Sequence, residues 1–103
     1  MKRVLVRAIG PSLLKFGEVA PARNLTLRVL KRGAVRATNK GWETGDSLGR
    51  QHVVQAFVAA GAFALEGGSG DCALVLNLEA GDFVAEAEAQ VAGEVLIEFF
   101  VIE

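Results

Sequence analysis

The alternation of apolar and polar side chains in the last third of the chain most constrains its fold. From Ala85 to Gln90, alanines alternate with acidic and amide side chains, and Phe83 lies on the same face as the alanines. A period of two places successive side chains on opposite faces of a β-strand, one dry and one wet. Two similar runs, Cys72–Leu78 and Glu94–Ile102, flank this one across short glycine-containing breaks. Because breaks this short are expected to join only antiparallel neighbours, we predict a meander of two hairpins.

The first part of the chain predicts three further strands. Lys2–Ile9 alternates, with Arg3 and Arg7 on the face that we expect to be the outer one. Asn24–Leu30 and Ala34–Asn39 are joined by a short loop whose glycine tolerates a left-handed backbone. On the second strand the side chains expected inward are Leu25, Leu27 and Val29.

One segment has helical periodicity. Apolar residues in Gln51–Ala60 recur at spacings of three and four, with Asp46 or Ser47 as a candidate start and Gly61 as a candidate end. His52 lies off the apolar stripe and is expected to be exposed. We therefore predict one all-β domain over residues 1–103. It is an antiparallel, jelly-roll-like β-sandwich of six to eight strands, with one short helix between its halves and its first and last strands close together.

Composition excludes several classes of function. Lys and Arg number 11 and Asp and Glu 12, so the net charge of −1 provides no basic field for nucleic acid. No apolar run approaches the roughly 20 residues that cross a bilayer. The basic opening is interrupted at Arg7, too early for a signal peptide. We expect no nucleic-acid partner and no membrane insertion, in either a cytoplasmic chain or a mature segment of a secreted protein.

The sequence offers no recognisable catalytic or metal-binding set. Cys72, the single cysteine, lies in an alternating run and is expected to be a buried small hydrophobe. His52, the single histidine, lies in a different element and offers no nucleophile–base pair. Asp71, Asp46 and Asn39 are too scattered to supply the roughly six to eight oxygens that calcium needs. We predict no catalytic residue, no cofactor and no metal.

The last strand is apolar on both faces. We expect one set of its side chains to point inward: Val95, Ile97, Phe99 and Val101. The opposite set mixes acidic and apolar residues and becomes wholly apolar toward the end. A strand with two apolar faces is covered on both sides, here by the helix or by a neighbouring subunit. The residues predicted at such an interface are Leu96, Phe99, Phe100 and Ile102.

A second candidate surface combines the single tryptophan with basic side chains. Trp42 lies in a glycine-rich loop and serves either as a lid over the core or as a stacking platform for a sugar. The preceding hairpin is basic, which indicates either a solvated face that protects an edge strand or an anion site. The predicted ligand contacts are Trp42, Arg28 and Arg36.

Several segments resemble a β-sandwich module that is repeated in secreted bacterial proteins. The opening RVLVRAIGPSL, residues 3–13, resembles that module's RVLIRAVGPSL. Similar segments follow in order along nearly the whole chain: 25–27, 37–39 with Trp42, 61–65, 68–74 and 79–81. The module is in turn similar to bacterial pre-peptidase C-terminal domains, which are small jelly-roll-like sandwiches appended to secreted enzymes and surface proteins.

The resemblance implies an extracellular or cell-surface role without catalysis. Some of these relatives hold calcium through acidic residues after the third strand, whereas here Asn39 is followed by Lys40 and Gly41. Their usual Tyr-Asp ending is replaced by the more apolar FFVIE of residues 99–103. The leading hypothesis is a structural module, such as an adhesin repeat or filament subunit, that self-associates or binds another extracellular protein. The alternative is a polysaccharide-binding accessory domain of a secreted enzyme.

Overall fold

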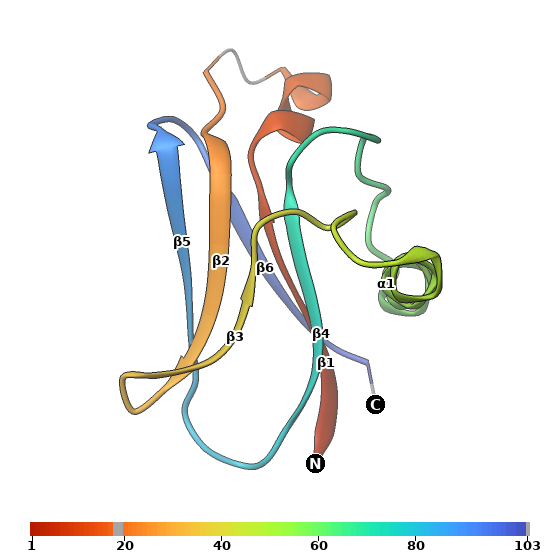
Figure 1. Cartoon of the computed structure of the whole chain (residues 1–103), viewed down its shortest axis with the longest axis vertical. Coiled ribbons are helices and arrows are strands. Elements are labelled where there is room, and N and C mark those ends of the chain that lie inside the picture. Colours follow the sequence, from red (N-terminus) through yellow and green to blue (C-terminus); the bar gives the residue numbers. More distant parts are fainter. Residues whose placement is uncertain (18–19, 103) are drawn as a thin grey trace.

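The protein is represented by a computed structural model that describes residues 1–17 and 20–102 (Figure 1). This part of the chain is mostly β-structure with one α-helix, as predicted. The strands are β1 (Lys2–Ile9), β2 (Arg23–Lys31), β3 (Ala34–Asn39), β4 (Cys72–Leu78), β5 (Val84–Val91) and β6 (Leu96–Val101). A 3-10 helix, η1 (Pro11–Phe16), follows β1, and helix α1 (Ser47–Ala60) lies between β3 and β4.

The strands form two antiparallel sheets of three strands each. One sheet has the order β4-β1-β6 and the other β3-β2-β5. Adjacency of the first and last strands is confirmed, because β1 pairs with β6 from Val4↔Val101 to Ile9↔Leu96. The β2–β3 hairpin is confirmed as well, and its turn uses positive φ at Arg32 (53°) and Gly33 (78°). Both angles suit the right-handed twist of a hairpin.

The predicted meander of the last third is wrong. β4 and β6 both pair with β1, whereas β5, which lies between them in sequence, pairs with β2 in the other sheet. Residues 79–83 and 92–95 therefore carry the chain across from one sheet to the other. A short break brings two strand ends together, but it does not decide whether the strands pair or face each other.

Helix α1 begins directly after Asp46, one of the two residues predicted to start it. The Asp46 carboxylate accepts a hydrogen bond from Gly49 N at 2.8 Å, and Gly61 ends the helix with a φ of 69°. Both are common solutions for unpaired backbone groups at helix ends. The predicted range 51–60 is therefore extended by one turn at its start. His52 is exposed, as expected.

Two hydrophobic clusters share β1. Val4, Val6 and Ala8 pack between the two sheets, with side chains of β4 and of β2. Leu5 and Ile9 point to the other face and pack against α1 and the segment that follows it. β1 is thus buried on both faces, and the expectation of an outer face carrying two arginines is wrong. Arg7 is fully buried and Arg3 is half-buried. The face was misassigned because α1 covers it, and alternation alone does not reveal a second cover.

The second sheet does not cover β6. β2 and β3 lie against β4, and β2 also contacts β1. In Figure 1 β3 and β4 are close together, whereas β6 passes behind β1. The residues predicted to point inward from the last strand are instead substantially exposed: Val95 (40%), Ile97 (41%), Phe99 (49%) and Val101 (62%). Ile97, Phe99 and Val101 lie on the predicted face, beside the core residues of β1, but their predicted burial is wrong because this face of β6 extends past the facing sheet.

A close backbone approach fixes the start of β6. Ala22 N donates to Glu94 O at 2.8 Å, and Glu94 N donates to Ala20 O at 2.9 Å. A Cβ on Gly93 would lie 2.4 Å from Ala20 O, which is far inside van der Waals contact. Only glycine permits this approach.

Candidate interaction surface

The outer edge of β6 presents unpaired strand backbone. Ile102 N donates to Arg3 O at 2.8 Å, so the backbone groups of Ile102 point toward β1. Backbone groups alternate in direction along a strand. In β6 the groups of Glu98 and Phe100 therefore also point toward β1. Those of Ile97, Phe99 and Val101 point away from it, and β6 is the terminal strand of its sheet.

The same three residues carry exposed apolar side chains. Ile97, Phe99 and Val101 are 41%, 49% and 62% exposed, and the flanking Leu96 is 40% exposed. In a soluble domain an edge strand is usually protected by charge, proline or a bulge. β3 carries Arg36 on its outer face and β5 carries two glutamates, whereas β6, which is described throughout, has Glu98 as its single charged residue. That carboxylate is turned inward.

An apolar cavity adjoins the exposed face of β6. Its volume is about 330 Å³, and its lining includes Val4, Leu78, Phe83, Phe99 and Val101. These side chains come from β1, the end of β4, the 79–83 crossing and the end of β6. The cavity extends the exposed apolar surface inward, so that a side chain placed beside Phe99 would contact the core.

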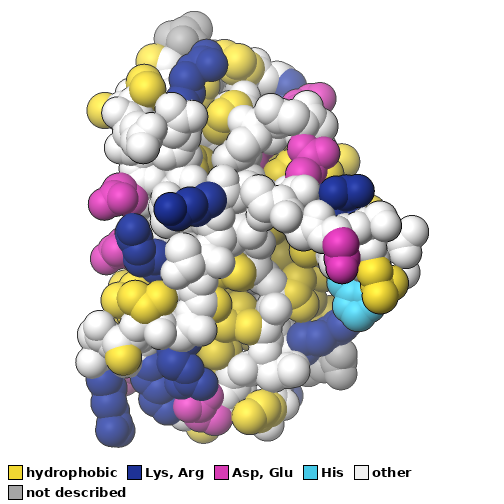
Figure 2. Space-filling model, in the orientation of Figure 1, with side chains coloured by type: hydrophobic (Ala, Val, Ile, Leu, Met, Phe, Trp, Pro, Cys, Tyr) yellow, Lys and Arg dark blue, Asp and Glu magenta, His cyan; other side chains and the backbone are white. Residues whose placement is uncertain are grey.

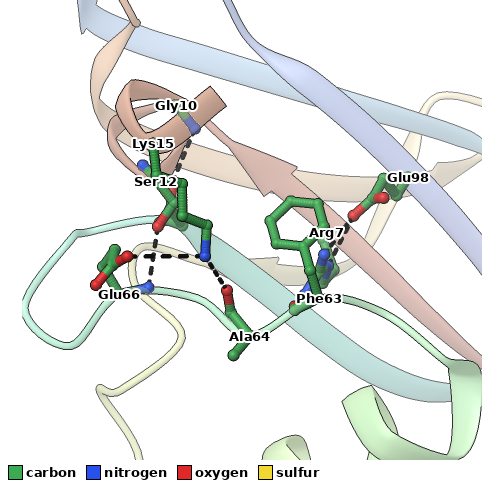
Figure 3. A network of polar contacts seen from close by, with 9 residues as sticks. Arg7, Gly10, Ser12, Lys15, Phe63, Ala64, Glu66 and Glu98 are labelled. Carbon is green, nitrogen blue, oxygen red and sulfur yellow. Dashed lines mark hydrogen bonds and ion pairs between the residues drawn. The ribbon is translucent and has the colours of Figure 1, made fainter. Parts of the chain in front are cut away.

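The opposite face of β6 is held by a buried cation (Figure 3). Arg7 Nη2 lies 2.6 Å from Glu98 Oε1, and Arg7 Nη1 donates to Phe63 O at 2.7 Å. The guanidinium carbon lies 4.8 Å from the ring centroid of Phe57 and 4.6 Å from that of Phe63. Aromatic faces and one carboxylate together replace the water that Arg7 loses on burial.

Phe100 and Ile102 lie on this inner side. Both are half-buried and pack against the cluster beneath α1. Of the four predicted interface residues, Leu96 and Phe99 are therefore on the exposed surface, whereas Phe100 and Ile102 contact the helix-side core. The helix supplies the second cover for this part of the strand.

Residues 10–12 (GPS) and 68–71 (GSGD) meet in a hydrogen-bond network. The fully buried Asp71 carboxylate accepts from Gly10 N at 2.8 Å and from the Ser12 and Ser69 hydroxyls. Ser12 Oγ in turn accepts from Glu66 N at 3.0 Å (Figure 3). These residues join the end of β1 to the segment before β4. These contacts give the residues of the network a structural role.

Asn39 and Asp46 also have structural partners. Asn39 Oδ1 accepts from Gly41 N at 3.0 Å and from Ala73 N at 3.1 Å. Asp46 caps α1. Asp71, Asp46 and Asn39 thus use their oxygens on separate backbone and hydroxyl groups. Among residues 1–17 and 20–102, no group of three or more His, Cys, Asp or Glu side chains is placed to hold a metal ion.

The predicted ligand residues do not converge. Trp42 is half-buried, with its ring centroid 5.8 Å from that of Phe57. Arg28 pairs with Glu86 and Glu88 on β5, at 3.4 and 3.5 Å. Neither Arg28 nor Arg36 is among the residues that line the cavities beside Trp42. A sugar site would therefore have to use Trp42 with other residues.

The basic hairpin is tied to the β4–β5 crossing. Both terminal nitrogens of Arg36 donate to Glu79 at 3.0 Å, and Lys31 Nζ donates to the same carboxylate at 3.0 Å. The hydrogen bonds from Arg36, then a backbone hydrogen bond and the hydrogen bond from Lys31, lower the pKa of Glu79 to about 2. This part of the basic surface is partly neutralised within the chain, which fits the interpretation of a solvated, protective face.

Cys72 is fully buried, as expected. Burial raises the pKa of its thiol to about 11, and its Sγ lies 3.4 Å from Leu25 O. A thiol with that pKa is almost wholly protonated at neutral pH and is a poor nucleophile. His52 lies on α1.

Arg7 is the structurally important residue that the sequence pattern did not identify. Its neighbours on the same face, Leu5 and Ile9, are large aliphatic residues. Two such residues around an arginine indicate a covered face rather than a solvated one. Glu98, a lone charge in the apolar last strand, was the corresponding indication for its partner.

A larger groove lies along the outer edge of β4. It has a volume of about 520 Å³, and Figure 2 shows apolar side chains on the floor of the hollow between the strands and α1. Its polar lining residues are Arg3, Asn39, Trp42, Thr44, His52 and Asn77.

Within the described ranges, no helix has the length and apolarity needed to span a bilayer. Comparisons of the chain with protein-family models, with curated proteins and with solved structures found no match.

Proposed function

We propose that the chain is a non-catalytic structural module that self-associates through the outer edge of β6. The observation that carries the proposal is the double role of Ile97, Phe99 and Val101. These residues turn unpaired backbone groups outward and expose apolar side chains at the same edge. Strand addition satisfies both needs, because main-chain hydrogen bonds and side-chain contacts form together.

A second copy of the chain is the partner that this surface fits. Its exposed residues are apolar, and apolar patches at a strand edge mark interaction sites. In this proposal the two sheets form an open, jelly-roll-like sandwich, and the neighbouring copy covers its exposed side. The extracellular location and the role as a filament subunit or adhesin repeat are supported by the resemblance of residues 3–13 to secreted modules.

The proposal is tested by light scattering during size-exclusion chromatography over a wide range of protein concentration. The parent is expected to exceed its monomer mass of 10.9 kDa as concentration rises. Phe99→Asp places a charge on the exposed edge and is expected to remain monomeric. The matched control is Val58→Asp, because Val58 is 78% exposed on α1, away from β6. Association of Phe99→Asp equal to that of the parent would overturn the proposal.

A further inference from the structure

We infer that association is head-to-tail: the β6 edge of one copy adds to the β4 edge of the next. The inference rests on the proposed function and specifies its partner surface. β4 and β6 are the two outer strands of the sheet β4-β1-β6. A contact between unlike edges leaves one free edge of each kind at the ends of the assembly, so it can continue.

The β4 edge has backbone groups to receive a strand. Ala73 N points outward, because it donates to Asn39 Oδ1 at 3.1 Å. By the alternation of strand backbone, Val75 and Asn77 also direct their N–H and C=O groups to the outer edge. Both residues line the 520 Å³ groove between β4 and α1. The groove therefore lies where an added strand would run.

The groove carries a charge opposite to that of the segment just before β6. Its lining includes Arg3 and His52 and no carboxylate among the described residues. Glu94, just before β6, is acidic and exposed, whereas Glu98 is already paired with the buried Arg7. Leu74 and Leu76 provide apolar lining on the sheet face to which Ile97, Phe99 and Val101 of an added β6 would point.

The second sheet supplies an independent argument. β3 contacts β4, and residues 92–95 join β5 directly to β6, so β3 and β4 share one side of the molecule and β5 and β6 the other. The outer face of β5 has an excess of negative charge, because Glu86 and Glu88 share the single Arg28. The β3 side has an excess of positive charge, because Arg36 and Lys31 share the single Glu79 carboxylate and Lys40 lies just after the strand. Joining unlike sides brings acid toward base.

A two-fold symmetric dimer would instead bring like charges together. Two β6 edges joined symmetrically would bring the acidic β5 strands of both copies together, and like charges at close range repel. β4 and β6 also run in the same direction, because both are antiparallel to β1. A copy displaced along the sheet with little reorientation therefore places its β4 parallel to β6. Sheet twist would turn successive copies into a helical filament.

The test mixes two variants that each block one edge. Asn77→Pro removes an outward N–H from β4 without removing a bond to β1, and proline is tolerated at such edge positions. Asn77→Lys, a charge at the same edge, is the second variant in case the proline disturbs folding. Phe99→Asp blocks β6. Oligomers are measured by native mass spectrometry for each variant alone and for the equimolar mixture.

Head-to-tail association predicts that each blocked variant alone is monomeric. The mixture is expected to form one-to-one heterodimers that stop growing, because the open β6 of the Asn77 variant meets the open β4 of Phe99→Asp. Homodimers of both Asn77 variants, with no heterodimer in the mixture, would overturn the head-to-tail inference while leaving β6 self-association standing. A parent that never associates would instead remove the proposed function itself.

Discussion

Arg7 and Glu98 form an ion pair across β1 and β6, with Arg7 Nη2 2.6 Å from Glu98 Oε1 and the arginine side chain wholly buried. The pair joins the first strand to the last, 91 residues apart in sequence. It also orients β6, because the carboxylate that points inward leaves Ile97 and Phe99 on the exposed side. The interaction surface therefore depends on a charge pair beneath it.

Removal of Glu98 alone is expected to be costly. Glu98→Ala leaves the Arg7 guanidinium buried without its carboxylate, and breaking a buried pair costs about 3–5 kcal/mol. Glu98 is 20% exposed, which places the loss toward the low end of that range. Urea denaturation of Glu98→Ala, Arg7→Met and the double variant measures the coupling. The double variant should be more stable than the sum of the two losses predicts, and simple additivity would contradict this account.

Gly10 is expected to tolerate no side chain. A Cβ there would lie 2.3 Å from Ala22 O, so Gly10→Ala must displace backbone that packs beside β6. We expect Gly10→Ala to lower the free energy of unfolding by more than about 3 kcal/mol, the range of severe core disruptions. Gly45→Ala is the control, since the nearest atom to its added Cβ is 3.9 Å away. Equal stability of the two variants would show that the approach is not fixed.

The Glu79 cluster predicts a pH dependence. The pKa of Glu79 is lowered from 4.5 to about 2 by Arg36 and Lys31, so folding favours its ionised form. Its contribution to stability is present above pH 4.5 and is lost as the pH falls through about 2. The melting temperature of the parent should exceed that of Glu79→Gln at pH 6, and the gap should close near pH 2. A gap independent of pH would contradict the ion-pair assignment.

Cys72 is expected to report on the integrity of the core. Its thiol is fully buried with a pKa of about 11, so an aromatic disulfide reagent at pH 8 should label the native protein very slowly. Labelling should become rapid in denaturant. Phe99→Asp should retain the slow labelling of the parent, which would show that this variant loses association without loss of the fold. Fast labelling of the native parent would place the thiol outside the core.

Local features of the fold follow from the sequence where one residue decides them. The stop at Gly61, the β2–β3 turn and the cap at Asp46, one of two candidate starts, were predicted because each depends on backbone chemistry within a few residues. The inward positions Leu25, Leu27 and Val29 were also predicted correctly, and all are almost fully buried.

The partners of strands could not be predicted in the same way. The period of two in β4, β5 and β6 assigns side chains to faces, but it does not say which strand pairs with which or what covers each face. The pattern therefore predicts a hairpin at 79–83, an outward Arg7 and a buried Phe99, and the structure shows none of the three. The exposed surface was partly predicted, since an apolar last strand without protective charges is visible in the sequence. Its exposed face depends on where the second sheet ends.

Hydrogen exchange of the β6 backbone at low and high protein concentration tests the central claim most directly. The amides of Glu98 and Phe100 point toward β1 and should be protected at both concentrations. Those of Ile97, Phe99 and Val101 point away from β1, and we expect fast exchange at low concentration and protection at high concentration. If these three amides exchange at the same rate at both concentrations, the outer edge of β6 does not receive another strand and the account is wrong.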